Sequence, residues 1–374
     1  MFCHSPWSNI DFSPDGKLSP CCKFQTRHYT DTYNIQQHSV TQYANSNFLK
    51  QIKTEILSDQ WPTGCERCRV EEQNSIQSKR QLDYLRWEEN YKNYQLIDNN
   101  FITASIAFGN TCNLKCITCG PASSSRWRKE AKDIYNVTIE HYKFFKNSFV
   151  QDFVHNTPAI IHIDIPGGEP FLSGVPEQQE LLQYYIDAGQ SNNITLHYTT
   201  NATVFPDGKW WQLWTHFKEV DIQLSIDGVG DRYEYIRYPA DWGQVVNNVN
   251  AYVNKQSLDN IRLSVSHTVS AYNIYYLDEF FTWCHQVGLP RPWLGKVHTP
   301  AHMRPEVWPD AIKRVIVTQL QSSAHADAHT WAELIQNCDG SEHFELFKTR
   351  LHQHDAYRNL DFSKTFPELA AFIQ

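Results

Sequence analysis

The chain has 374 residues, a formal net charge of −8 and 10 cysteines. This charge, with no run of lysine and arginine, argues against a nucleic-acid binder, since phosphate binding needs concentrated basic charge. No run of about 18 apolar residues and no signal-peptide pattern is visible, which predicts a cytoplasmic protein with no membrane partner. The cysteines fall into groups, as metal ligands do, and this favours metal sites over disulfides.

The first group of cysteines lies near the N-terminus and consists of Cys3, Cys21, Cys22, Cys65 and Cys68. Four of these thiols would be enough for one fully coordinated iron–sulfur cluster. They would also be enough for one zinc ion, so both kinds of site stay open at this point. Helical stretches are expected around residues 47–53 and 75–82.

The second group follows a strand-like run at residues 102–109 and consists of Cys112, Cys116 and Cys119. Three thiolates on one tight loop can bind three irons of a [4Fe–4S] cube and leave the fourth iron without a protein ligand. Zinc fits this spacing poorly, because a closed zinc site needs four ligands and usually takes two Cys-x2-Cys pairs. The sequence therefore predicts a cluster with an open iron.

Five further strands are expected after this loop. The one at residues 160–165 runs into the turn Gly167-Gly168-Glu169-Pro170, which by itself could be only a turn. The others are expected at residues 194–200, which end at Asn201, and at 220–226, 262–269 and 293–297. Short β-rich runs that alternate with helical ones predict an α/β fold with a parallel sheet.

Two charged residues follow the strand at 220–226. Ser225 and Asp227 share strand parity, so both can face the interior of the sheet. Arg237 follows ten positions later, and its guanidinium fork suits a carboxylate. The alternatives are a turn residue for Asp227 and a solvated helix charge for Arg237. In the next strand, Ser264, Ser266 and Thr268 form the polar face, which would turn His267 outward.

The cysteine triplet and the Gly-Gly-Glu-Pro turn together resemble the radical S-adenosylmethionine (SAM) superfamily. The resemblance implies a partial (β/α)6 barrel at residues 100–300, with a [4Fe–4S] cluster on Cys112, Cys116 and Cys119 whose free iron binds SAM. Reductive cleavage of SAM would then give a 5′-deoxyadenosyl radical that abstracts a substrate hydrogen. The SAM contacts it implies are Gly167, Gly168, Glu169, Pro170, Asn201, Ser225, Asp227 and Arg237. One departure is Ile117-Thr118, where the family often has an aromatic residue against the adenine.

Gly16, five positions before Cys21, and the later Cys-x2-Cys resemble the SPASM/twitch module of this superfamily. The module usually follows the barrel, whereas here it would occupy residues 1–95, before it. The resemblance implies one auxiliary [4Fe–4S] cluster on Cys3, Cys21, Cys65 and Cys68, with Cys22 left over; zinc is the alternative. Residues 301–374 are expected to form a helical extension packed on the barrel, with Phe344, Phe347 and Leu351 at helical spacing.

The commonest role of this architecture is to modify a ribosomally made peptide or protein side chain, by crosslinking, oxidation or epimerisation. A radical SAM enzyme for a small molecule and a non-catalytic iron–sulfur or zinc protein are the alternatives. The resemblance also implies a flavodoxin- or ferredoxin-type electron donor. The sequence assigns no catalytic acid, base or hydrogen donor, and Cys284 and Cys338 are expected to be small buried apolar residues.

Overall fold

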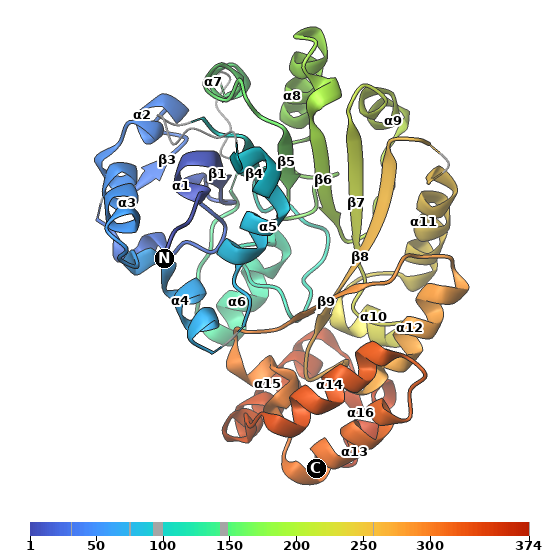
Figure 1. Cartoon of the computed structure of the whole chain (residues 1–374). Coiled ribbons are helices and arrows are strands. Elements are labelled where there is room, and N and C mark those ends of the chain that lie inside the picture. The colour runs from blue at the N-terminus through green and yellow to red at the C-terminus, as the bar shows by residue number, and fades with distance from the viewer. Residues whose placement is uncertain (31, 75, 93–99, 143–148, 257, 374) are drawn as a thin grey trace. The chain divides into compact units, whose positions relative to one another are not determined.

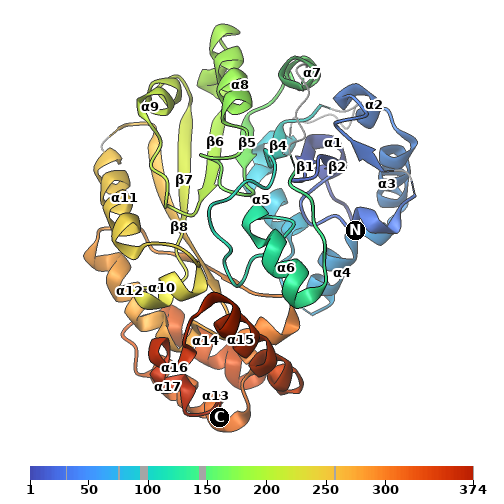
Figure 2. The ribbon, with the colours of Figure 1, turned by 180° about the vertical axis from the view of Figure 1, so that it is seen from behind.

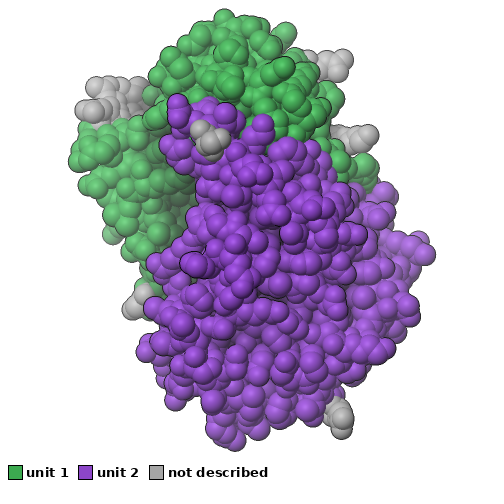
Figure 3. Space-filling view, turned by 90° about the vertical axis from the view of Figure 1, so that its right-hand side faces the viewer, with its two compact units in different colours: residues 1–111, 141–198, 206–220 green, residues 112–140, 199–205, 221–374 purple. Residues whose placement is uncertain are grey.

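The computed structural model describes residues 1–30, 32–74, 76–92, 100–142, 149–256 and 258–373 (Figure 1). Two compact units are present (Figure 3). Unit 1 contains residues 1–111, 141–198 and 206–220, and unit 2 contains residues 112–140, 199–205 and 221–374.

The described strands are β1 (Asn9–Phe12), β2 (Lys17–Ser19), β3 (Tyr33–Asn34), β4 (Thr103–Ile106), β5 (His162–Ile165), β6 (Thr195–Thr200), β7 (Glu219–Ser225), β8 (Ile261–Val269) and β9 (Trp293–Lys296). The described α-helices are α1 (Ser5–Ser8), α2 (Val40–Ala44), α3 (Asn47–Leu57), α4 (Glu66–Gln73), α5 (Lys79–Lys92), α6 (Arg128–Tyr135), α7 (Phe149–Asn156), α8 (Val175–Asp187), α9 (Gly208–Trp214), α10 (Asp231–Ile236), α11 (Trp242–Lys255), α12 (Leu277–Gln286), α13 (Asp310–Gln321), α14 (Ala326–Asn337), α15 (Phe344–Arg358), α16 (Phe362–Thr365) and α17 (Pro367–Ala370). Short 3-10 helices lie at Thr26–His28, Thr63–Cys65, Ser125–Trp127, Ser191–Asn193, Ile274–Tyr276, Ala301–Met303, Pro305–Val307 and Ser341–His343.

The strands of unit 1 lie in the order β3-β2-β1-β4-β5-β6. β1 pairs antiparallel with β2 but parallel with β4, and β4, β5 and β6 continue in parallel. Ile10 and Phe12 are buried on one face of β1, so Asn9 and Asp11 belong to the other face. The N-terminal strands therefore extend the parallel sheet rather than form a sheet of their own.

Unit 2 contains β8 and β9, which pair in parallel, and β7 from Asp221 onward. Along β8, fully or nearly buried residues alternate with partly exposed ones, as expected for a strand with one polar face. Figure 2 shows the C-terminal helices α15, α16 and α17, which belong to the same unit. Tyr272 packs against Phe347 of α15 and Phe366, with ring centroids 5.2 and 6.2 Å apart.

All six strands expected between residues 102 and 297 are present, and the fold is α/β with a parallel sheet, as predicted. The expected helix at 47–53 is the start of α3. The expected helix at 75–82 is placed later, as α5, and Ser75 lies outside the described residues. Residues 93–99 also lie outside the described residues, and the predicted boundary between the cysteine module and the barrel falls there.

The predicted apolar face of the C-terminal extension is present on α15, where Phe344, Phe347 and Leu351 are buried. Over the described ranges, no helix has both the length and the apolar content that crossing a membrane requires.

Candidate functional site

The loop that carries Cys112, Cys116 and Cys119 is held by its backbone within unit 2. The N–H groups of Lys115 and Ile117 donate to the carbonyl oxygens of Tyr238 and Ile236, each at 2.7 Å. Trp127 donates its indole N–H to the carbonyl of Cys116 at 3.1 Å. These bonds fix the loop between its first and last cysteines without using a thiol.

Two polar side chains of unit 2 point at the sulfurs of this loop. Asn201 donates from Nδ2 to Cys112 Sγ at 3.7 Å and to Asn113 Oδ1 at 3.0 Å. Arg237 places Nη1 at 4.0 Å from Cys116 Sγ. The structure therefore brings two of the sequence-predicted SAM contacts to the cysteine triplet itself.

Arg237 is not a solvated helix charge, because only 9% of the residue is exposed. It lies directly after α10 and forms an ion pair with Asp227, with Nη2 and Oδ2 2.7 Å apart. Asp227 is fully buried and accepts from the backbone N–H of Thr268 at 2.7 Å. The turn alternative for Asp227 is therefore wrong, since its carboxylate is a buried partner of both Arg237 and the end of β8.

The polar faces of β7 and β8 meet as the parity predicted. The hydroxyls of Ser225 and Ser266 are 3.3 Å apart. His267 lies on the opposite face, where its ring packs on Phe280 of α12 with centroids 4.2 Å apart. Burial lowers the pKa of His267 to about 4, so this histidine is neutral at physiological pH. It is therefore a structural residue behind the strand.

The Gly167-Gly168-Glu169-Pro170 turn packs on the residues that lead into the cysteine loop. Gly168 has φ +53, and a Cβ placed there would lie 2.4 Å from the carbonyl oxygen of Thr111. The backbone N–H of Glu169 donates to that same oxygen at 2.8 Å, and Glu169 is fully buried. The turn therefore fixes Thr111 within unit 1, and Thr111 is the residue before Cys112 in the sequence.

We expect Gly168→Ala to destabilise the chain more than Gly189→Ala. Both glycines have positive φ, 53° and 65°, but nothing lies within 4 Å of a Cβ at Gly189. Each variant bears the left-handed backbone cost of about 1–2 kcal/mol, and only Gly168→Ala adds a clash with backbone. Thermal unfolding of the two full-length variants measures this, and equal losses would contradict the close approach.

The four N-terminal cysteines that the sequence singled out lie in one pocket of unit 1. Its lining includes Cys3, Cys21, Cys65 and Cys68, with Trp61, Phe24, Ile56 and Gly64 among the other residues. Burial and, to a smaller extent, neighbouring Cys3 and Cys68 raise the pKa of the Cys65 thiol to about 12. Metal binding requires thiolates, so a bound cation would have to supply the charge that stabilises them.

Cys22 differs from these four, because its side chain is exposed and does not line the pocket.

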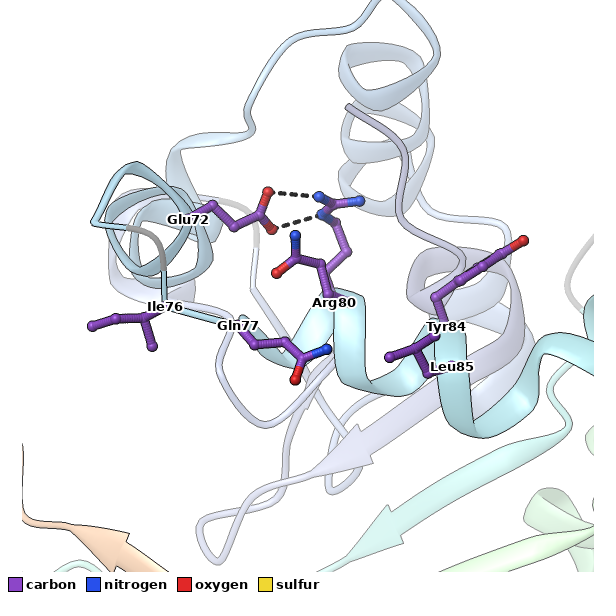
Figure 4. Close-up of a pocket in the computed structure, with 7 residues that line it drawn as sticks. Glu72, Ile76, Gln77, Arg80, Tyr84 and Leu85 are labelled. Atoms are coloured by element: carbon purple, nitrogen blue, oxygen red, sulfur yellow. Dashed lines mark hydrogen bonds and ion pairs between the residues drawn. The ribbon is translucent and has the colours of Figure 1, made fainter. Parts of the chain in front are cut away.

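Arg80 lines the pocket from α5 and donates to the carbonyl of Phe2 at 2.7 Å, which fixes the segment before Cys3. The same arginine forms an ion pair with Glu72 at 2.6 Å in a surface pocket (Figure 4). Arg80 thus ties α4, α5 and the N-terminal segment together around the cysteines.

Among the described residues, no three His, Cys, Asp or Glu side chains are arranged to hold one metal ion. Each thiolate of a cubane binds a different iron, so its ligands lie further apart than those of one zinc. In unit 2, the buried Nε of Arg237 has no hydrogen-bond partner, which leaves a cationic donor for a carboxylate beside Cys116.

A row of polar residues crosses the sheet of unit 1 in register. Asp11 pairs with Ser105, Ser105 with Asp164, and Asp164 with His197, one residue from each of β1, β4, β5 and β6. This row could not be predicted from the sequence, because the four-residue strands β1, β4 and β5 have too little alternation to reveal a face. Burial and the neighbouring Asp164 raise the pKa of Asp11 to about 7.

This pKa predicts a pH-dependent effect of Asp11→Asn. Because the pKa of Asp11 is higher in the folded than in the unfolded state, its ionisation lowers the stability of the folded protein as pH rises from about 4 to about 7. Asparagine cannot ionise, so the stability of the variant relative to wild type should rise by roughly 2 kcal/mol between pH 5 and pH 7. Urea unfolding at both pH values checks this, with the exposed Asp187→Asn as control. Parallel pH profiles for wild type and Asp11→Asn would contradict it.

The two remaining cysteines differ from each other. Cys284 is 2% exposed on α12, as the sequence predicted. Cys338 is only partly buried at the end of α14, so the expectation of a buried thiol is wrong there. Its position is the reason, because Cys338 is the C-cap residue after the last turn of α14 and is followed by the exposed Asp339.

Residues 3–69 match the family model named SPASM, an iron-sulfur cluster-binding domain. The N-terminal part of the chain is therefore a SPASM domain, as its cysteine pattern predicted. No curated protein sequence matches the chain.

Among solved structures, the chain is similar to native anSMEcpe with bound AdoMet and the Kp18Cys peptide, with 15% identity and a TM-score of 0.44, covering 58% of this chain and 57% of that one. It is also similar to Streptococcus suis SuiB bound to precursor peptide SuiA, with 14% identity and a TM-score of 0.38, covering 66% and 51%. TYW1 with a lysine-pyruvate adduct has 12% identity and a TM-score of 0.38, covering 64% and 82%. The chain spans about half the length of native anSMEcpe with bound AdoMet, at 52%.

Proposed function

We propose that the chain is a radical SAM enzyme that modifies a side chain of a ribosomally made peptide or protein. The observation that carries the proposal is the cysteine triplet with Arg237 and Asn201 at its sulfurs. When bound, a [4Fe–4S] cluster with SAM on its open iron supplies an electron and a 5′-deoxyadenosyl radical that takes a substrate hydrogen. The protein supplies position, charge and exclusion of water.

The side chains around the triplet have distinct parts in this proposal. Arg237 holds positive charge beside the Cys116 thiolate and offers its free Nε to the SAM carboxylate. Asp227 keeps that guanidinium oriented through the 2.7 Å ion pair. The Gly-Gly-Glu-Pro turn offers backbone carbonyls and the Glu169 carboxylate to the SAM ammonium. Ser225 and Asn201 are proposed SAM contacts at the ends of their strands.

The SPASM domain supports an auxiliary [4Fe–4S] cluster on Cys3, Cys21, Cys65 and Cys68. Such a cluster can accept an electron from a substrate radical, which oxidative crosslinking needs. A flavodoxin- or ferredoxin-type protein would supply electrons, and a reducing compartment such as the cytoplasm keeps the thiolates available. A substrate that is a small molecule is the alternative.

Turnover with SAM tests the enzyme proposal. The anaerobically reconstituted chain, incubated with SAM and dithionite, should form 5′-deoxyadenosine and methionine in equal amounts. The Cys65→Ala/Cys68→Ala variant should retain this cleavage, because its change lies in the SPASM domain. If no 5′-deoxyadenosine forms in the fully loaded wild type, the chain is a non-catalytic iron–sulfur protein.

The substrate class is tested separately. Short open reading frames beside the gene provide candidate peptides, which are incubated with the active chain and weighed by mass spectrometry. A loss of two mass units would indicate a crosslink or dehydrogenation, and deuterium uptake from solvent would indicate epimerisation. Unchanged peptides alongside a modified sugar, amino acid or nucleotide would favour the small-molecule alternative.

A further inference from the structure

The cysteine loop of unit 2 is bound to a helix near the end of the chain. Arg358, the last residue of α15, donates from Nη2 to the carbonyl of Lys115 at 3.0 Å. Lys115 lies inside the triplet, directly before Cys116. Arg358 therefore bonds the backbone between two candidate cluster ligands, although it lies 243 positions from Lys115 in the sequence.

One buried carboxylate organises this contact. Glu130 of α6 is fully buried and forms ion pairs with Lys115 at 2.6 Å and Arg358 at 2.9 Å. His354 of α15 completes the set, with Nδ1 2.7 Å from Glu130 Oε1 and Nε2 2.6 Å from the Tyr135 hydroxyl. Because Glu130 can only accept, Nδ1 of His354 donates to it and Nε2 accepts from the tyrosine.

The network holds two positive charges around one negative charge. Burial opposes ionisation of Glu130, but His354, Arg358 and Lys115 together lower its pKa to about 2. Burial lowers the pKa of His354, so the histidine is neutral. One carboxylate thus faces two cations, and the loss of Glu130 would leave both of them without a compensating charge.

Aromatic rings fix the two cations in place. The guanidinium of Arg358 lies 4.8 Å from the ring centre of Trp127, whose indole N–H holds the Cys116 carbonyl. The ammonium of Lys115 lies 5.1 Å from the rings of both Tyr238 and Tyr357. The carbonyls of Lys115 and Cys116 are therefore held by Arg358 and Trp127, which also contact each other.

We propose that Arg358 and Glu130 are positioning residues for the cysteine loop, and that α15 is part of the cluster-binding apparatus rather than a cover for the barrel. Arg358 acts through the Lys115 carbonyl and through Trp127, and Glu130 holds both cations. The assignment rests on the proposed cluster at Cys112, Cys116 and Cys119. It gives the C-terminal extension a role in ordering the loop before any cofactor binds.

Arg358→Lys tests the assignment, since it keeps the charge but loses the fork that reaches both Glu130 and Lys115. The full-length apo chain is treated with iodoacetamide, and alkylation at each cysteine is followed by mass spectrometry. Cys116 is 9% exposed and Cys284 is 2% exposed, so both react slowly in the wild type. We expect Cys116 to react at least fivefold faster in Arg358→Lys, with Cys284 unchanged.

Asp133→Asn is the matched control, because it removes the charge of the carboxylate that accepts from the Tyr357 hydroxyl at 3.0 Å, an exposed contact between the same two helices. An unchanged rate at Cys116 in Arg358→Lys would overturn the proposal, and so would an equal rise at Cys284, which would mean general loosening. The thiol measurement needs neither cluster nor turnover, so it stands even if SAM cleavage fails. In the reconstituted chain, Arg358→Lys should also shift the g values of the reduced triplet cluster, whereas Asp133→Asn should not.

Discussion

Replacement of Cys112, Cys116 and Cys119 by alanine is expected to lower the iron content of the anaerobically reconstituted chain from about eight to about four atoms per molecule. The reason is that the two cysteine groups lie in different compact units, so each can hold its cluster independently. Acid-labile sulfide should fall in parallel. The measurement is an iron and sulfide assay on the full-length chain.

The control is Cys284→Ala, which removes a buried thiol that belongs to neither group. It should leave the iron content unchanged. A wild-type value of about four that falls to none would show that the SPASM cysteines hold zinc or no metal in this chain. That outcome would remove the auxiliary electron path and favour redox-neutral chemistry.

Asp227→Ala is expected to be the most destabilising single substitution near the triplet. It leaves Arg237 charged and buried beside Cys116, and removal of one partner from a buried ion pair typically costs about 3–5 kcal/mol. The substitution also leaves the backbone N–H of Thr268 without the carboxylate that accepts its hydrogen bond. Urea unfolding of the full-length chain should therefore show a clearly lower midpoint.

Two further variants make this result specific. Asp231→Ala removes an exposed carboxylate in the first turn of α10 and should cost less than about 1 kcal/mol. The double variant Asp227→Ala/Arg237→Met removes both charges and should recover part of the loss, because an apolar replacement of a buried pair is often tolerated. If Asp227→Ala alone were as stable as wild type, the ion pair would not be the element that holds this site.

The sequence was sufficient for those features whose signal is local. The six strands from residue 103 to 296 are β-rich runs between turns, and the two cysteine groups have recognisable spacing. Strand parity predicted the polar faces that carry Ser225 and Ser266, whereas the contact between the two hydroxyls is seen only in the structure. Cys21 rather than Cys22 lines the pocket because adjacent side chains on one backbone point in different directions.

Other features depend on distant residues and have no local signal. Glu130 reads as an ordinary helix charge until His354 and Arg358, 224 and 228 positions later, are placed beside it. β1 has only four residues, too few for a periodicity to show that it would join β4. The helix expected from Ser75 begins at Lys79, because propensity locates helix ends poorly.

The central claim is that the triplet cluster has an open iron that binds SAM beside Arg237. The most direct test is electron paramagnetic resonance of the dithionite-reduced chain in the Cys65→Ala/Cys68→Ala background, with and without SAM labelled with ¹⁵N in its amino group. The account predicts that SAM shifts the g values and that the labelled nitrogen couples to the cluster. A spectrum that SAM leaves unchanged, with no nitrogen coupling, would contradict it.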